Sequence, residues 1–274
     1  MIRAVLLLCL LTLNVNAQEC KGHWNMKVDT SRVEFDQQKA RIPLVFNVDA
    51  FYRNCGATSV FLQTYSGQQL VIRNGALELR GTVTNEYGST VGIELNQGIL
   101  LPVDSRSNTT TYWIEFKNSQ HAYPGTYLAK VNAELYEVAG SRSKTETIRL
   151  KVPAYLVMKF IHPLSQHATM DFGHLKTGQT KSKEMRFVSN TTIEVEFDSK
   201  YGALRHTEYP EKLIEYEVLF SGNLIDVDNG KVTIPKTKEN GTTKRLTVKI
   251  VDDLKGAYAG FYSDTITITA KVQP

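Results

Sequence analysis

The stretch that decides the fold is the last one, Tyr258-Ala-Gly-Phe-Tyr-Ser-Asp-Thr-Ile-Thr-Ile-Thr-Ala-Lys-Val272. Apolar and polar residues alternate in its second half, so that Ile266, Ile268, Ala270 and Val272 point to one side and the threonines point to the other. This period of two is typical of a half-buried β-strand. The sequence stops two residues later, and we therefore expect a domain that finishes on this strand with no further strand to cover it.

A related phrase, Tyr123-Pro-Gly-Thr-Tyr-Leu-Ala-Lys-Val131, occurs earlier in the chain. Both phrases read Tyr-x-Gly-x-Tyr and then alternate, as a turn that leads into a strand does. Two copies of one corner predict two related β-domains in tandem. Coincidence is the alternative, because Gly and Tyr are common where turns meet strands. The segment around Pro153 is the best boundary, which gives domains over 18–152 and 153–274.

The rest of the chain consists of short alternating stretches separated by turn signals about every ten residues. Asn74-Gly75 is one such signal, and it predicts a hairpin. No segment of convincing length shows the period of a helix. A chain of 274 residues is long enough for two compact domains. We therefore predict an all-β fold of two tandem immunoglobulin-like β-sandwich domains.

Residues 1–17 have the pattern of a secretory signal peptide. Arg3 supplies the positive start, the apolar run from 4 to 13 is too short to span a bilayer, and Val15-Asn-Ala17 fits a cleavage site. No second long apolar run follows, and no lipid-anchor signal is present at the end. We expect the mature chain to be exported.

The chain has three cysteines, and removal of the signal peptide would remove Cys9. Cys20 and Cys55 remain, and an even pair in an exported chain most simply forms one disulfide. In the chain-entropy model, closing a loop of this size stabilises the fold by about 4 kcal/mol. The alternative, a free reactive thiol, requires a basic partner and a reducing compartment, and nothing in the sequence indicates either.

Composition argues against two classes of function. The net charge is +4, and no run of Lys or Arg is longer than two, so we expect no nucleic-acid partner. His162, His167 and His174 are the closest of six histidines, but their spacing fits no zinc pattern. Glu211 and Glu215 could serve as a glycosidase pair only if their geometry agreed. We expect no enzyme, no cofactor and no metal site.

Several phrases of the second half occur in the order and spacing of a known family. They are Phe172-Gly-His-Leu-Lys-Thr-Gly-Gln-Thr-Lys-Ser182, Val188-Ser-Asn190, Val195-Glu-Phe-Asp-Ser199 and Gly260-Phe-Tyr-Ser-Asp-Thr-Ile-Thr-Ile268. This half resembles chaperone–usher pilus subunits, and among them the spore-coat-U-like pilins of the archaic systems. The first half resembles the family only loosely, through the Tyr123 corner and the early cysteine pair.

The resemblance implies an immunoglobulin-like domain that lacks its last strand and exposes a groove in its place. A periplasmic chaperone would fill this groove first, and the N-terminal extension of the next pilus subunit would replace the chaperone. Such β-strand addition uses main-chain hydrogen bonds for affinity and alternate side chains for specificity. The two groove walls would be formed by Tyr155, Val157, Ile161, Ile266, Ile268, Ala270 and Val272.

One departure from the family suggests a particular position in the fibre. Cys20 follows almost directly on the expected cleavage site, which leaves nearly no donor extension. A subunit that accepts a strand but gives none would sit at the tip, or act as a minor subunit. The resemblance then implies assembly at an outer-membrane usher, a place in the fimbrium at the cell surface, and an N-terminal adhesin domain that binds a host or abiotic surface receptor. Candidate receptor-binding residues, chosen because they lie in loops, are Tyr52, Arg53, Tyr65, Tyr87 and Arg106.

Two other functions compete with this one. A periplasmic pilus-assembly chaperone is also exported and has two immunoglobulin-like domains, and Arg32 and Arg41 would then hold a subunit's terminal carboxylate. The pattern around these arginines is poor, and the pilin-like ending at 258–272 would stay unexplained. The other candidate is a secreted carbohydrate-active β-protein, which activity assays would distinguish.

Overall fold

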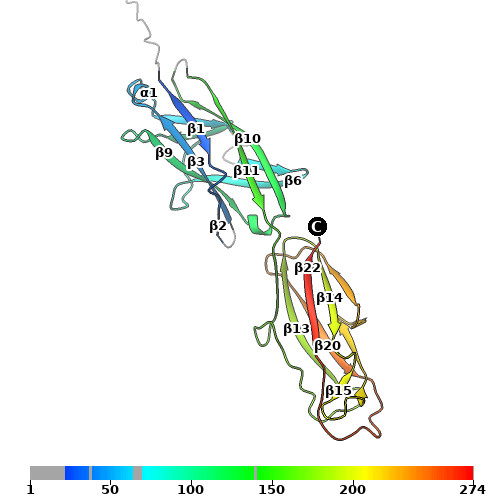
Figure 1. The fold of residues 1–274 in the computed structure, drawn as a ribbon. Coiled ribbons are helices and arrows are strands. Elements are labelled where there is room, and N and C mark those ends of the chain that lie inside the picture. Colours follow the sequence, from blue (N-terminus) through cyan, green and yellow to red (C-terminus); the bar gives the residue numbers. More distant parts are fainter. Residues whose placement is uncertain (1–21, 37–38, 64–69, 139–140, 274) are drawn as a thin grey trace, which may run out of the picture.

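The protein is described here by a computed structural model of residues 22–36, 39–63, 70–138 and 141–273. Two elongated bodies follow one another along the chain and are joined end to end (Figure 1). The first contains the residues up to Val152, and the second contains the residues from Leu156 onward. The predicted signal peptide, 1–17, and Cys20 lie outside the described residues, so both remain predictions.

The N-terminal body is an eleven-stranded antiparallel sheet that folds over on itself to enclose one core. The strand order is β1-β3-β9-β6-β5-β10-β4-β8-β7, with β11 paired to β10 and β2 paired to β3. Its elements are β1 (Trp24–Val28), β2 (Glu34–Asp36), β3 (Lys39–Val48), α1 (Ala50–Asn54), β4 (Ser59–Gln63), β5 (Leu70–Asn74), β6 (Leu77–Thr84), β7 (Ile93–Leu95), β8 (Gly98–Pro102), β9 (Thr109–Lys117), the 3-10 helix η1 (Ser119–His121), β10 (Gly125–Leu135) and β11 (Lys144–Val152).

Alternation places the apolar side chains of these strands inside the N-terminal body. In β1, Trp24, Met26 and Val28 are buried and the residues between them are exposed. The hairpin predicted at Asn74-Gly75 is confirmed, because Asn74 pairs with Leu77 across the turn between β5 and β6. The residue Gly75 has a φ of 58°, which a glycine adopts without strain.

The short helix α1 has no counterpart in the sequence-based prediction. Asp49 caps it, because its carboxylate accepts a hydrogen bond from the backbone N–H of Tyr52 at 3.0 Å. The same carboxylate also accepts from the backbone N–H of His23, next to β1, at 2.5 Å. A helix of five residues is too short to show a 3.6-residue period, so only the cap could have indicated it.

The C-terminal body is a sandwich of two antiparallel sheets with a small third sheet at its far end. The larger sheet has the order β12-β13-β20-β17-β18, the opposite sheet has the order β19-β14-β22, and the small sheet has the order β16-β15-β21. The strands are β12 (Leu156–Phe160), β13 (Thr180–Ser189), β14 (Ile193–Ser199), β15 (Leu204–His206), β16 (Leu213–Ile214), β17 (Tyr216–Phe220), β18 (Asn223–Ile225), β19 (Lys231–Ile234), β20 (Thr242–Ile250), β21 (Tyr262–Ser263) and β22 (Ile266–Val272).

Aromatic side chains from both sheets fill the core of the C-terminal body. Phe220 on β17 contacts Phe187 on β13 and Phe197 on β14, with ring centroids 6.1 and 5.2 Å apart and edge-on geometry. This core shares no residue with the core of the N-terminal body. The all-β prediction is therefore confirmed, and the C-terminal body has the layers of an immunoglobulin-like sandwich.

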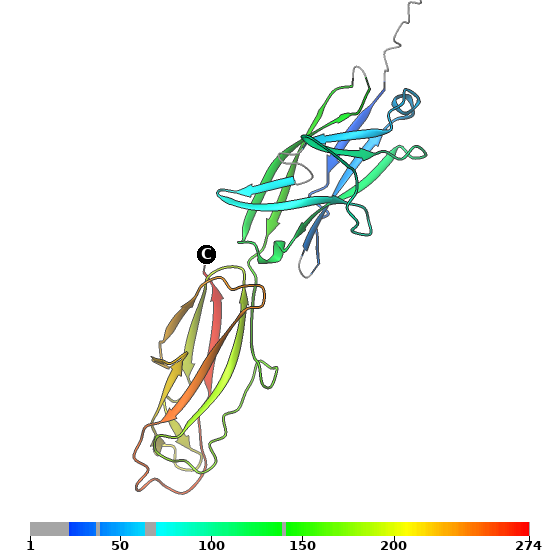
Figure 2. The ribbon, with the colours of Figure 1, turned by 180° about the vertical axis from the view of Figure 1, so that it is seen from behind.

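A buried asparagine joins the two bodies (Figure 2 shows the junction from behind). The side chain of Asn190 donates to the backbone oxygens of Gln120, at 3.1 Å, and Pro153, at 2.9 Å, and accepts from the N–H of Tyr155 at 2.8 Å. One amide thus binds the N-terminal body and two residues of the segment that connects it to β12. The boundary between 152 and 153 stays a prediction.

Candidate functional site

The strand β22 has an unpaired edge. Over its whole length β22 pairs with β14, from Ile193 opposite Val272 to Ser199 opposite Ile266. Within the described ranges, no strand pairs with its other edge. The first strand of the same body, β12, is also an edge strand, because its only partner is β13. The strands β12 and β22 approach each other without pairing, and we call the two facing edges the open seam.

Apolar side chains at the open seam are incompletely covered. Ile266, Ile268 and Ala270 on β22 pack on the core but are only partly buried, and Val272 is 40% exposed. On the neighbouring strand, Ile193, Val195 and Phe197 are buried. An unpaired strand edge beside exposed apolar side chains is the arrangement on which a further strand can add.

The face of β12 differs from the one predicted. Leu156, Met158 and Phe160 pack on the core, whereas the sequence analysis assigned Tyr155, Val157 and Ile161 to the groove. The strand is apolar on both faces except for Lys159, so alternation gives no clear choice of face. Lys159 shares a face with Val157 and Ile161, and its charge was the one signal that this face points away from the core.

Three charged side chains on the outer surface attach β22 to its own sheet. Glu196 on β14 accepts from Lys271 on β22 at 2.6 Å and from Lys231 on β19 at 2.7 Å. Hydrogen bonds from Lys231 and Lys271 lower the pKa of Glu196 to about 2. These contacts are exposed, so they align the strand more than they stabilise it.

The two predicted corners have the same geometry in the structure. The hydroxyl of Tyr127 donates to the backbone oxygen of Tyr123 at 3.0 Å, and the hydroxyl of Tyr262 donates to that of Tyr258 at 3.1 Å. The glycines between them, Gly125 and Gly260, have φ values of 144° and 151°, which L-residues rarely adopt. The repeated phrase therefore corresponds to a repeated structure, the tyrosine corner of immunoglobulin-like sandwiches.

The receptor-binding candidates fall into separate groups. Arg53 donates from its guanidinium to the backbone oxygen of Ser105 at 3.0 Å, which places α1 beside the loop that carries Arg106, at the end of the body opposite the junction (Figure 1). Tyr52 is not a surface residue, since it is only 6% exposed and belongs to the core. Its neighbour Phe51 is 70% exposed. Tyr65 lies outside the described residues.

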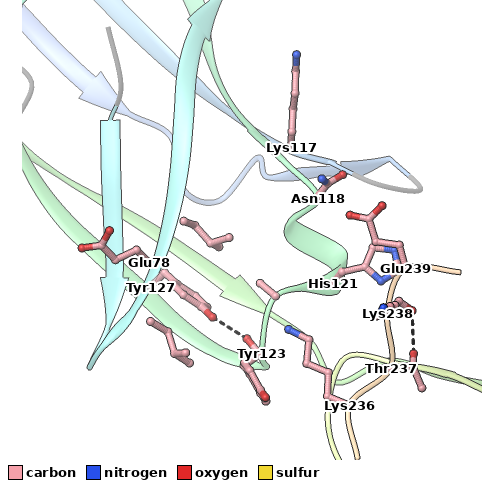
Figure 3. Close-up of a pocket in the computed structure, with 13 residues that line it drawn as sticks. Glu78, Lys117, Asn118, His121, Tyr123, Tyr127, Lys236, Thr237, Lys238 and Glu239 are labelled. Carbon is pink, nitrogen blue, oxygen red and sulfur yellow. Dashed lines mark hydrogen bonds between the residues drawn. The ribbon is translucent and has the colours of Figure 1, made fainter. Parts of the chain in front are cut away.

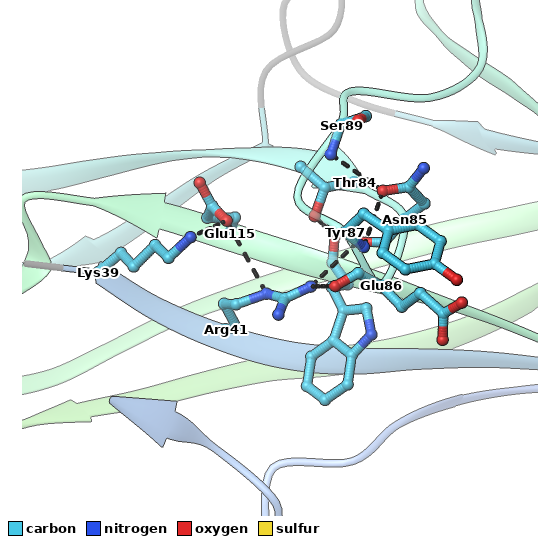
Figure 4. A network of polar contacts seen from close by, with 9 residues as sticks. Lys39, Arg41, Thr84, Asn85, Glu86, Tyr87, Ser89 and Glu115 are labelled. Atoms are coloured by element: carbon cyan, nitrogen blue, oxygen red, sulfur yellow. Dashed lines mark hydrogen bonds and ion pairs between the residues drawn. The ribbon is translucent and has the colours of Figure 1, made fainter. Parts of the chain in front are cut away.

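Tyr87 lies apart from that group, on a loop with a rigid base (Figure 4). The Asn85 carboxamide oxygen accepts from the N–H groups of Tyr87, at 3.0 Å, and Ser89, at 2.9 Å. Arg41 donates to the backbone oxygens of Asn85 and Glu86, both at 3.0 Å. The ring of Tyr87 is 84% exposed on this support.

Arg41 is held by several groups, although its buried Nε forms no hydrogen bond within the described residues. Besides the two backbone oxygens, its guanidinium lies over the ring of Trp113, 4.5 Å from the centroid, and its Nε is 3.8 Å from the buried carboxylate of Glu115. Lys39 approaches the same carboxylate at 3.1 Å. A guanidinium held in this way is not free to bind a partner's carboxylate, which is the role that the chaperone hypothesis assigns to Arg41.

The described ranges contain no group of three or more His, Cys, Asp or Glu side chains arranged to hold a metal ion. None of their helices is long and apolar enough to cross a membrane. Cys55 directly follows α1, and its predicted disulfide partner, Cys20, lies outside the described part, so the pairing stays a prediction.

No protein-family model and no curated protein matches the chain. Among solved structures, it is similar to a chain of the CsuC–CsuE chaperone–tip adhesion subunit pre-assembly complex of Acinetobacter baumannii, with 13% identity over 78% of this chain and 84% of the other, and a TM-score of 0.43. The CupB6 tip adhesin of Pseudomonas aeruginosa gives 11% identity over 92% and 96%, with a TM-score of 0.35. AggB, a minor subunit of aggregative adherence fimbriae of Escherichia coli, gives 17% over 47% and 99%, with a TM-score of 0.31. Chaperone–usher pilus subunits and tip adhesins are thus among its structural neighbours.

Proposed function

We propose that the chain is a tip or minor subunit, an adhesin, of a chaperone–usher pilus, and that its C-terminal body accepts a β-strand from another polypeptide. The observation that carries the proposal is the open seam, where two strand edges and a row of half-covered apolar side chains face the same space. The resemblance of the second half to pilins gives the same expectation from the sequence.

The open seam is suited to a strand with apolar residues at every second position. Ile266, Ile268 and Ala270 would contact its inward side chains from one sheet, and Leu156, Met158 and Phe160 would contact them from the other. Its backbone would pair with the free edge of β22, because β22 pairs only with β14 within the described part of the chain. In this proposal a periplasmic chaperone supplies the added strand first. A neighbouring subunit then replaces it with its own strand at the usher.

The N-terminal body would carry the attachment function. Arg53, Arg106 and the exposed Phe51 lie at its end opposite the junction. Solvent-exposed aromatic and arginine side chains are the usual anchors of binding surfaces. We keep these residues as the candidate receptor surface, with Tyr87 as a separate candidate on its own loop.

The experiment is peptide complementation of the purified full chain. A synthetic peptide with alternating apolar residues is compared with a scrambled peptide of the same composition by calorimetry. We expect the alternating peptide to raise the unfolding temperature of the C-terminal body by about 10 °C or more, because burial of several apolar side chains contributes a few kcal/mol and each kcal/mol shifts the midpoint by roughly 4–8 °C. Coexpression with a pilus chaperone should yield a one-to-one complex that the peptide dissociates.

Two results would contradict the proposal. One is a chain that is stable alone and whose unfolding temperature does not respond to the alternating peptide. The other is an equal response to the scrambled peptide, because nonspecific apolar binding has no strand register. Either result would favour a free-standing β-protein.

A further inference from the structure

A pocket lies where the two bodies meet, lined by no residue of β12 or β22 (Figure 3). Its volume is about 460 Å³, which is in the range of small-molecule sites. Three segments form it: the start of β6, the stretch from the end of β9 to the Tyr123 corner, and residues 236–239 between β19 and β20. The buried amide of Asn190 spans the same junction, so both walls are anchored.

One cation of this pocket, Lys236, forms no ion pair with a carboxylate among the residues that the structure describes. The ammonium group of Lys236 lies 4.0 Å from the centroid of the Tyr123 ring. Burial lowers the pKa of Lys236, and no charged partner contributes to the shift. A half-buried ammonium whose charge is met only by an aromatic face favours an anion beside it.

A second polar group of the pocket is also without an internal partner. His121 lines the pocket, and its buried Nδ1 has no hydrogen-bond partner among the described residues. Buried polar atoms in folded proteins are nearly always hydrogen-bonded, so an orphaned one at a pocket indicates a missing group. His121 thus adds a polar group to the lining of the pocket that contains Lys236 (Figure 3).

The remaining lining mixes apolar and charged side chains, and two further lysines, Lys117 and Lys238, belong to it. Tyr127 is buried, and its hydroxyl is held by the backbone oxygen of Tyr123. Leu77 and Leu79 line the pocket from β6. Glu239 brings one carboxylate from the C-terminal body. Glu78 is engaged by Arg73 at 2.8 Å, and its side chain points away from Tyr123.

The charged and apolar side chains of the pocket together indicate the class of ligand that it would bind. A bare phosphate could pair with the lysines of the pocket, but it would leave the apolar wall of Leu77 and Leu79 uncovered. A pyranose ring that carries a carboxylate fits better: the carboxylate pairs with Lys236, the apolar ring face packs on Leu77 and Leu79, and the hydroxyls bond to His121 and Glu239. We propose that this pocket between the bodies binds a carboxylated sugar residue, such as a uronic acid.

The test uses the purified full chain and a matched pair of sugars. D-Glucuronate and D-glucose differ only in the carboxylate, and calorimetric titration or saturation-transfer NMR measures the Kd of each. We expect glucuronate to bind at least about tenfold more tightly than glucose, as a charge-assisted hydrogen bond contributes. A tetrasaccharide containing glucuronate distinguishes the source: tighter binding of the tetrasaccharide indicates a polysaccharide, and equal or weaker binding indicates the free sugar.

Two lysine variants test whether the sugar binds at Lys236. Lys236→Gln removes the charge and keeps most of the length of the side chain, so we expect the Kd for glucuronate to rise about tenfold or more. Lys181→Gln, on the exposed surface of β13, is the control and should leave the Kd unchanged. Equal binding of glucuronate and glucose, no binding of any of the three sugars, or unchanged binding by a folded Lys236→Gln protein would overturn the proposal.

The sugar-binding proposal can be tested independently of the proposal that the chain is a pilus subunit. Lys236 lies on neither β12 nor β22, so Lys236→Gln should leave the response to the alternating peptide intact. Loss of sugar binding together with a normal peptide response would assign the effect to the pocket.

Discussion

Each body contains a tyrosine corner followed by a strand, but the two strands differ in how many neighbouring strands they pair with. The strand after the first corner, β10, pairs with β11 on one side and with β4 and β5 on the other. The strand after the second corner, β22, pairs with β14 alone within the described ranges. Tyr127 and Val131 on β10 are buried, whereas Ile266 and Ile268 on β22 are half-buried.

The difference in burial between β10 and β22 arises because β10 has an additional partner strand, β11. In the N-terminal body β11 follows β10 in the chain, pairs with it from Gly125 opposite Val152 to Ala133 opposite Lys144, and buries Ile148 and Leu150 completely. It also lies against β1, where the indole nitrogen of Trp24 donates to the backbone oxygen of Arg142 at 3.0 Å. The N-terminal body thus contains in its own chain the kind of strand that, in our proposal, a partner supplies to the C-terminal body.

The largest effect should come from the closing strand of the N-terminal body. Leu150→Ala removes a side chain that is 0% exposed, and we expect it to lower the free energy of unfolding of this body by about 3 kcal/mol, through lost burial and the cavity left behind. Chemical denaturation measures the loss, and hydrogen exchange of the β10 amides locates it. A loss below about 1 kcal/mol would mean that β11 is not a structural part of this core.

The matched substitution in the C-terminal body should cost less. Ile268→Ala changes a half-buried side chain, so we expect a loss of about 1 kcal/mol with the seam open. With the alternating peptide bound, the loss should rise to about 2 kcal/mol or more, because the peptide covers the side chain. Thermal unfolding with and without peptide gives both values. If the two values were equal, the peptide would not contact β22.

The smallest effect concerns the charges that attach β22 to its sheet. The pKa of Glu196 is lowered from 4.5 to about 2 in the folded protein, so its contribution is present above pH 4.5 and is lost as the pH falls toward 2. We expect Glu196→Gln to lower the unfolding temperature slightly at pH 7, with a difference from the wild type that disappears near pH 2. Calorimetry at several pH values measures it, with Glu211→Gln, at an exposed position, as the control. A difference that does not change with pH would show that the pairing with Lys231 and Lys271 is absent in solution.

The sequence predicted the features that arise from local patterns. The strand Ile266–Val272 has the bounds that its alternation indicates, because a period of two requires only neighbouring residues. The Asn74-Gly75 hairpin and both tyrosine corners also depend on a few adjacent residues with special backbone angles. The all-β class follows from such patterns taken together.

Only the tertiary structure decided which side chains are covered. The seven residues from Tyr155 to Ile161 are almost uniformly apolar, so the choice of Leu156, Met158 and Phe160 as the inner face depended on packing against the distant strands β13 and β22. Tyr52 is buried because α1, formed around the cap at Asp49, turns it inward. The pocket around Lys236 joins segments more than a hundred residues apart. Burial is a property of what packs from elsewhere in the chain, and one sequence read locally does not contain it.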